Sequence, residues 1–216
     1  MSNTASDSYI AKPATGTGSG VLVLHAWWGL NDFFKTFCQR LAQEGFITLA
    51  PDLYHGQIAA TVEDAERLHG LLDDKKAAAE LLAAVDQLQQ IPGVTRREIG
   101  VVGFSMGAFW SVWLSLKRPE DIRAVTVFYG AGEGDYTHAR AAYLGNFAEN
   151  DPWEPVEGIQ KMEKDLLAAG RPVKFHTYPG TGHWFFEENR PDAYRPVAAA
   201  LAWGRTLAFL KAELAG

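Results

Sequence analysis

The first candidate for chemistry is a G-x-S-x-G pentapeptide, Gly103-Phe104-Ser105-Met106-Gly107. An apolar run, "EIGVVGF", precedes Ser105 and predicts a buried strand, and "SMGAFWSVWLSLK" predicts a helix that begins at the serine. This strand–turn–helix context favours a nucleophile elbow, in which small flanking residues permit a sharp, strained turn and the hydroxyl projects above the sheet. The alternative is a helix-capping serine between two turn glycines.

A serine hydroxyl needs a base before it can act as a nucleophile, and the chain has six histidines. His183 lies in "YPGTGHWFFEEN", a loop between the last predicted strand and the last predicted helix, so we expect it at the same sheet edge as Ser105. His69 falls in a helical, exposed segment, His176 falls within a strand, and His138 falls in another loop. His183 is therefore the best-placed base, the alternative being an ordinary polar loop residue.

Asp151 is the candidate acid that orients the histidine. It follows the predicted strand "AAYLGNF" after the short loop "AEND", which puts it at the carboxyl edge as well. The order Ser105…Asp151…His183 is the chain order of α/β-hydrolase triads. Glu149 is a close rival and Asp135 a weaker one, and Asp151 could also be an ordinary surface aspartate.

The elements that must position these residues alternate along the chain. The pattern predicts strands at 21–25, 46–50, 98–104, 124–130, 141–147 and 173–178, and helices at about 31–44, 61–90, 105–117, 154–169 and 191–214. Continuous apolar strands between helices indicate an α/β protein with a mostly parallel sheet and helices on both faces. Ligands of such sheets bind at the carboxyl ends of the strands.

An acyl-transfer site also needs two N–H donors for the developing oxyanion. We expect Met106 to supply one from the helix N-terminus and Trp27, in the loop "HAWWGL", to supply the other. His25 either organises this loop or simply ends a strand, and no catalytic role is assigned to it. Aromatic residues in or beside the carboxyl-edge loops predict a mainly aromatic pocket, unless about half of them belong to the core. They are Trp28, Tyr54, Phe104, Trp153 and Trp184, together with Trp27.

The composition bounds the class of protein. A chain of 216 residues, 47% hydrophobic, fits one domain over residues 1–216 with a sizeable core. A net charge of −6 without a basic stripe argues against nucleic acid as a partner. We expect no metal, no cofactor, no membrane span and a monomer. A lone cysteine, Cys38, and an N-terminus without a secretory pattern suggest a cytoplasmic protein.

Several blocks together resemble the dienelactone hydrolase family of α/β-hydrolases over about residues 9–212. They are "VLVLHAWWGLND", "LAQEGFITLAPDLYHG", "IGVVGFSMGAFW", "YGAGEG", "LGNFAENDPWEP" and "YPGTGHWFFEEN". The resemblance implies a small three-layer α/β-hydrolase fold without a large lid. It also implies a triad of Ser105, Asp151 and His183 with oxyanion donors at Trp27 and Met106.

Two positions depart from the best-known members of this family. Those members carry a cysteine nucleophile where this chain has Ser105, and a glutamate where it has Ala26. In them the glutamate helps convert the thiol to the thiolate, a step that serine does not need, so the two changes are mutually consistent. They put dienelactone itself in doubt as the substrate more than they do ester or lactone hydrolysis in general.

The sequence therefore predicts a hydrolase that cleaves a small carboxylic ester or lactone through an acyl-enzyme. "GTGSG" (16–20) superficially suggests a dinucleotide-binding oxidoreductase, but it precedes a strand instead of opening a helix after one. A non-catalytic binding protein on the same fold, or an acyltransferase with the same triad, are the remaining alternatives. Arg140 or Arg190 could contact a substrate carboxylate, although no arginine pair stands out.

Overall fold

The computed structural model describes residues 8–215, whose strands form one twisted sheet in the order β1-β3-β2-β4-β5-β6-β7. Only β1 runs antiparallel to its neighbour, and the other pairs are parallel. The strands are β1 (Tyr9–Ala11), β2 (Gly20–Leu24), β3 (Ile47–Ala50), β4 (Ile99–Phe104), β5 (Ile122–Phe128), β6 (Ala142–Asn150) and β7 (Val173–Gly182). The carboxyl ends of the parallel strands therefore meet at one edge.

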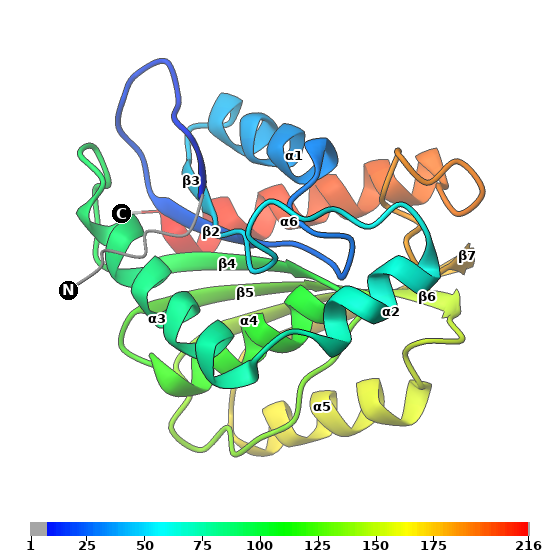
Figure 1. The fold of residues 1–216 in the computed structure, drawn as a ribbon. Coiled ribbons are helices and arrows are strands. Elements are labelled where there is room, and N and C mark those ends of the chain that lie inside the picture. Colours follow the sequence, from blue (N-terminus) through cyan, green and yellow to red (C-terminus); the bar gives the residue numbers. More distant parts are fainter. Residues whose placement is uncertain (1–7, 216) are drawn as a thin grey trace.

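Helices cover both faces of this sheet, with α1 and α6 on one side and α3, α4 and α5 on the other (Figure 1). The helices are α1 (Asp32–Gln43), α2 (Val62–Gly70), α3 (Asp74–Gln90), α4 (Met106–Lys117), α5 (Val156–Ala168) and α6 (Pro196–Leu214). This arrangement confirms the expected three-layer α/β-hydrolase fold. Along residues 8–215, no helix combines the length and the apolar character that crossing a bilayer requires.

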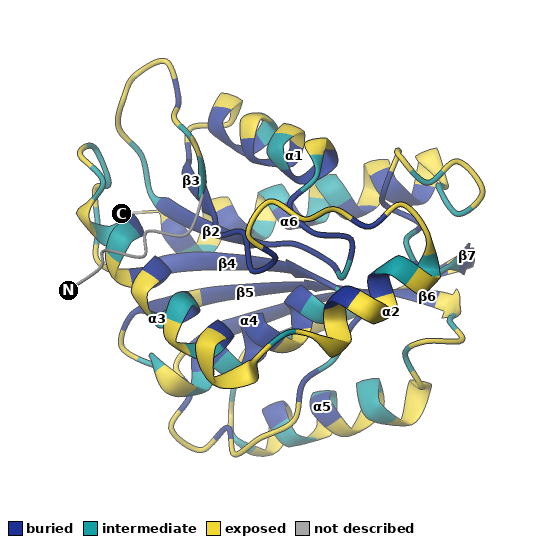
Figure 2. Cartoon of the chain, in the orientation of Figure 1, coloured by how far each residue is buried: buried dark blue, intermediate teal, exposed yellow. Residues whose placement is uncertain are grey.

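The core lies on both faces of the central strands, which are buried along most of their length (Figure 2). On the face under α1 and α6, Phe104 stacks on Phe128 with ring centroids 4.6 Å apart. Phe37 and Phe186 pack against the same ring. Large aromatic side chains supply most of the burial free energy of such a core. The packing on this face therefore holds β4, the strand that leads into Ser105, rigidly in place.

Several elements differ from the expected ones, and β6 and β7 also continue beyond their expected ends. The helix expected at 61–90 is interrupted, because Asp73 accepts N–H bonds from Lys75 and Lys76 and starts α3 as a separate helix. The last helix begins at Pro196 instead of 191, since proline lacks the N–H that a helix interior needs but suits its first turn. The short edge strand β1 was not expected, because three residues carry too little periodicity to be recognised.

Candidate active site

Ser105 occupies the junction between β4 and α4 with a left-handed backbone, φ 52° and ψ −115°. This conformation is strained for a residue with a side chain, by about 1–3 kcal/mol, and is held here by its surroundings. One support is the bond from the Ser105 N–H to the carbonyl oxygen of Phe128, at 2.9 Å. Although Ser105 stands at the N-cap position, its side chain makes no capping bond. Its hydroxyl is therefore available to other groups.

The two glycines of the pentapeptide allow the close approach on which this turn depends. A side-chain carbon on Gly103 would collide with the carbonyl of Gly107 and the hydroxyl of Ser111 on α4. A side-chain carbon on Gly107 would collide with the carbonyls of Leu24 and His25 at the end of β2. The pattern G-x-S-x-G thus brings α4 against both strands and fixes the position of its N-terminus.

His183 directly follows β7, and its imidazole reaches back to the serine. Nε2 of His183 lies 2.9 Å from Oγ of Ser105. The rings of Tyr129 and Trp184 flank the imidazole, with centroids 4.9 and 5.0 Å from it. Because the His183 side chain is only 5% exposed, these neighbours restrict its rotation and keep Nε2 directed at the hydroxyl.

Asp151 directly follows β6 and holds the other nitrogen of the imidazole. Its two carboxylate oxygens lie 2.7 and 2.8 Å from Nδ1 of His183, and its side chain is 4% exposed. Oδ1 also accepts the backbone N–H groups of Trp153 and Glu154, which fixes the carboxylate within its turn. A carboxylate on Nδ1 favours the tautomer with its proton there, so Nε2 is free to accept a proton from Ser105.

The rival carboxylates point elsewhere. Glu149 lies on β6 and accepts the N–H of Gly180 at 2.9 Å, on the exposed side of the β6–β7 pair. Asp135 accepts bonds from Thr137 in its own loop. Of these three carboxylates, therefore, only Asp151 contacts His183. The strand β6 also extends through the residues expected as a loop, which places the Asp151 side chain immediately at the sheet edge.

The two residues expected to supply oxyanion donors, Trp27 and Met106, line the same cavity as Ser105. Met106 is the first residue of α4, where unpaired N–H groups and the helix dipole favour negative charge. Trp27 follows β2 in a loop that His25 organises. The His25 ring is fully buried, its Nδ1 lies 2.6 Å from the carbonyl oxygen of Ala26, and its Nε2 accepts the N–H of Leu53 at 3.2 Å. Of the two roles considered for His25, the structure favours the loop-organising one.

A cavity of about 240 Å³ opens above the serine. Its walls are mainly aromatic and apolar, with two histidines and one glutamate as the ionisable groups. The lining residues are Trp27, His69, Ser105, Met106, Phe109, Ala131, Trp153, Glu154 and His183. This volume accommodates a small, partly apolar molecule next to the hydroxyl of Ser105.

Several residues expected to line the pocket belong to the core instead. Trp28, Tyr54 and Phe104 are buried, and none of them lines the cavity at Ser105. Successive residues of a strand or extended loop point to opposite sides, which explains why Phe104 packs beneath the sheet while Ser105 faces the cavity. Trp184 is half-buried and stacks beside Trp27 behind the cavity wall. Of the five expected pocket residues, only Trp153 lines the cavity, and Trp27, which was expected with them, lines it too.

Sequence reasoning missed four lining residues. Phe109 lies one helical turn after Ser105 on α4, a spacing that could have revealed it, and Glu154 lies in the turn that Asp151 begins. The sequence carries no comparable signal for His69, on α2, or for Ala131, which follows β5. They reach the cavity only through the tertiary fold.

A second ionisable pair lies behind His183. The O–H of Tyr129 donates to Oε1 of Glu187 at 2.7 Å, and Glu187 is completely buried. Burial raises the pKa of Glu187 to about 7, although the bond from Tyr129 and the charge of Arg190 act in the opposite direction. This pair fixes Tyr129 against the imidazole.

Among residues 8–215, no group of three His, Cys, Asp or Glu side chains is arranged to hold a metal ion.

The chain is similar to known proteins over nearly its whole length. Over 215 residues the chain is 35% identical to protein usf of Aquifex pyrophilus, covering 95% of this chain and 93% of that protein. It is 30% identical over 226 residues to a Bradyrhizobium protein provisionally named a 2-oxo-3-(5-oxofuran-2-ylidene)propanoate lactonase, covering 97% and 90%.

The fold is shared with a crystal structure from metagenomic libraries, the dienelactone hydrolase-like promiscuous phosphotriesterase P91. The TM-score is 0.85, the identity is 20%, and the match covers 95% of this chain and 92% of that one. Finally, the model of the dienelactone hydrolase family matches residues 6–214, nearly the whole chain. The chain therefore belongs to the dienelactone hydrolase family.

Proposed function

We propose that this protein is a serine hydrolase that cleaves a small carboxylic ester or lactone through an acyl-enzyme. The single observation that carries the proposal is the continuous contact from Asp151 through His183 to Ser105. The two distances, 2.7 Å at Nδ1 and 2.9 Å at Nε2, match those of a base that is held by an acid and directed at a nucleophile.

In the first half of the reaction, Oγ of Ser105 attacks the carbonyl carbon while Nε2 of His183 takes the hydroxyl proton. Asp151 stabilises the imidazolium that forms and keeps its proton on Nδ1. The backbone N–H groups of Trp27 and Met106 donate to the oxyanion, and each such donor lowers the barrier by about 3–4 kcal/mol. The tetrahedral intermediate then collapses, the C–O bond to the leaving alcohol breaks, and His183 returns the proton to that oxygen.

In the second half, water attacks the acyl-enzyme. His183 takes a proton from the water, the same two N–H groups hold the oxyanion, and Oγ of Ser105 leaves with the proton that His183 returns. For a lactone, the leaving alcohol remains attached to the acyl chain, so a single hydroxy acid is released. Because the nucleophile is a hydroxyl and not a thiol, no glutamate is needed to form a thiolate, which agrees with Ala26 at that position of the loop.

The substrate class follows from the cavity and from the relatives. A volume of about 240 Å³ with Trp27, Phe109 and Trp153 in its walls favours a compact acyl group with apolar surface. Two observations from the comparisons support lactones as well as simple esters: the family is that of dienelactone hydrolases, and the Bradyrhizobium relative is named for a lactonase activity.

The test is covalent labelling combined with turnover. The purified protein is treated with a fluorophosphonate probe, the adduct is mapped by mass spectrometry, and hydrolysis of 4-nitrophenyl acetate is measured in parallel. We expect one adduct on Ser105 and a loss of turnover of at least about 10⁴-fold in Ser105→Ala. His183→Ala should lose both labelling and turnover. Ser19→Ala is the matched control, because that hydroxyl bonds to the carbonyl of Leu214 far from the site.

Two results would overturn the proposal. One is turnover by Ser105→Ala at the wild-type rate, and the other is an intact, unlabelled Ser105 in a protein that hydrolyses no ester. The second result would favour a non-catalytic binding protein on this fold. Product analysis in the presence of small alcohols separates hydrolysis from acyl transfer, since a transferase forms a new ester in preference to the acid.

A further inference from the structure

The charges around the cavity are unbalanced. Among the described residues that line it, Glu154 is the single carboxylate and neither lysine nor arginine is present. The remaining polar side chains are Ser105, His183 and His69. Asp151 adds a second negative charge directly behind His183. Two carboxylates thus lie at or beside the cavity, and no lysine or arginine among its lining residues balances them.

Glu154 is held in place by two backbone bonds. Its Oε2 accepts the N–H of Ala131 at 3.1 Å, and its own N–H donates to Oδ1 of Asp151 at 3.1 Å. The carboxylate is thus fixed relative to the residues around Ser105 and cannot swing away from a bound molecule. Because the residue is partly buried, its charge is less screened by solvent than a surface charge would be.

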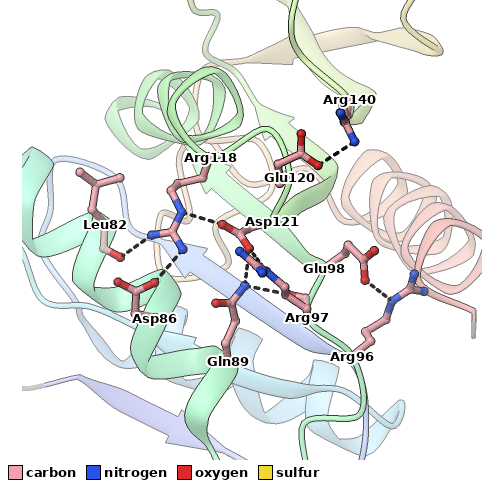
Figure 3. Close-up of polar contacts among 10 residues, drawn as sticks. All are labelled: Leu82, Asp86, Gln89, Arg96, Arg97, Glu98, Arg118, Glu120, Asp121 and Arg140. Carbon is pink, nitrogen blue, oxygen red and sulfur yellow. Dashed lines mark hydrogen bonds and ion pairs between the residues drawn. The ribbon is translucent and has the colours of Figure 1, made fainter.

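The two arginines considered as contacts for a substrate carboxylate are engaged elsewhere. Arg190 lies over the ring of Trp28, with its guanidinium carbon 3.1 Å from the ring centroid, and does not line the cavity. Arg140 pairs with Glu120 at 2.6 Å, near the start of β5 at the opposite edge of the sheet (Figure 3). A carboxylate bound near Ser105 would therefore meet the charge of Glu154 without a compensating arginine.

We infer that this cavity selects against esters and lactones that carry a carboxylate on the acyl group, and that Glu154 imposes the selection. The inference rests on the proposed function, specifies its substrate as neutral or cationic, and so separates this chain from the Bradyrhizobium relative, which is named as a lactonase of a propanoate. Substrates with a hydroxyl or ammonium group fit the same position, because either group can donate a hydrogen bond to the carboxylate oxygens of Glu154. Glu154 is thus a specificity-determining residue, outside the triad.

The experiment compares three 4-nitrophenyl esters that differ only in the charge at the far end of the acyl chain: hexanoate, hydrogen adipate and 6-aminohexanoate. Values of kcat/KM are measured at about pH 8.5, where histidine side chains are ordinarily neutral. The variant is Glu154→Gln, which keeps an oxygen to accept the N–H of Ala131. The matched control is Glu157→Gln, which removes the same charge from an exposed residue of α5 that does not line the cavity.

We expect the wild type to prefer hexanoate over hydrogen adipate by about tenfold, the scale of one partly screened charge repulsion at close range. The 6-aminohexanoate should be hydrolysed at least as well as the hexanoate. Glu154→Gln should reduce the preference to about twofold, mainly by improving the adipate. Glu157→Gln should keep the wild-type preference.

Equal kcat/KM values for hexanoate and hydrogen adipate in the wild type would overturn the inference alone. So would a preference that Glu154→Gln leaves unchanged. If Glu154→Gln lowered kcat/KM by the same factor for all three esters, the inference would also be overturned. Glu154 would then act through Asp151 and not on the substrate. If neither these three esters nor 4-nitrophenyl acetate is hydrolysed, the proposed function fails and takes this inference with it.

Discussion

The imidazole of His25 fixes the orientation of the peptide that joins Ala26 to Trp27. Leu53 donates its N–H to Nε2, so the proton of the neutral ring is on Nδ1 and is donated to the carbonyl oxygen of Ala26 at 2.6 Å. Burial lowers the pKa of His25, which keeps the ring neutral. The C=O and N–H of a trans peptide point in opposite directions, so the Trp27 N–H faces away from His25.

Because we propose that the Trp27 N–H donates to the oxyanion, His25 would act as a positioning residue for that donor, and His25→Ala is expected to lower kcat by about 100-fold. KM should change by less than about threefold, since ground-state binding does not depend on that N–H. Steady-state kinetics on 4-nitrophenyl acetate measure both values. His176→Ala, on β7 away from the cavity, is the control and should retain the wild-type kcat. A kcat for His25→Ala within threefold of the wild type would contradict the assignment.

Replacing a carboxylate by its amide should affect kcat very differently at Asp151 and at Glu149. Asp151→Asn should lower kcat by about 10³- to 10⁴-fold, because the amide favours the wrong tautomer of His183 and leaves the imidazolium unsupported. Glu149→Gln should stay within about threefold of the wild type, since its carboxylate contacts Gly180 and not the imidazole. The two variants differ from the wild type by one charge each, so general electrostatic effects cancel. The reverse order of effects would make Glu149 the acid.

Glu187 predicts a dependence of stability on pH. Its pKa of about 7 in the folded protein lies above the value of about 4.3 for an unfolded glutamate. The folded state therefore binds more protons within this window, and the free energy of unfolding falls as the pH rises through it. Urea denaturation should show that the wild type loses about 2–3 kcal/mol more than Glu187→Gln between pH 5 and about pH 8.

The adjacent residue supplies the control for this measurement. Glu188→Gln removes the same charge from an exposed position and should follow the wild-type curve. If the free energy of unfolding of the wild type and that of Glu187→Gln changed in parallel with pH, the buried carboxyl would titrate at its ordinary pKa.

The fold could be predicted from the sequence because most strands are continuous apolar runs between amphipathic helices. The order of Ser105, Asp151 and His183 could be predicted as well, since each follows a strand and parallel strands bring their carboxyl ends together. These inferences use only the direction of the chain and the rule that helices cover both faces of a parallel sheet. They do not depend on how any side chain packs.

The cavity walls could not be predicted, because composition does not say which way a side chain points. Trp27 and Trp28 are neighbours of the same type, yet Trp27 lines the cavity and Trp28 is fully buried under Arg190. His69 comes from a helix about 36 positions before Ser105, and only the path of the chain between α2 and β4 brings it near. The role proposed for Glu154 could not be predicted either, since it depends on a contact with Ala131.

Breaking the ion-pair cluster at the amino edge of the sheet should lower the stability of the protein without lowering its catalytic activity. The carboxylate of Asp121, only 4% exposed, accepts bonds from Arg97 and Arg118, both at 2.6 Å, and from Gln89 at 2.9 Å (Figure 3). Burial alone would raise the pKa of Asp121, but these bonds outweigh burial and hold the pKa below its usual range. Asp121→Asn should therefore reduce the free energy of unfolding at pH 7 by about 2 kcal/mol.

The same pKa direction fixes how this difference depends on pH. A carboxylate with a depressed folded pKa stabilises the protein fully above the unfolded value of about 3.9 and loses that contribution as the pH falls toward the folded value. The difference in the free energy of unfolding between the wild type and Asp121→Asn, measured in urea titrations, should thus become smaller below about pH 4. Glu120→Gln breaks the exposed pair with Arg140 and should change stability by less than about 0.5 kcal/mol. A destabilisation of Asp121→Asn no larger than that of Glu120→Gln would contradict the buried-cluster argument.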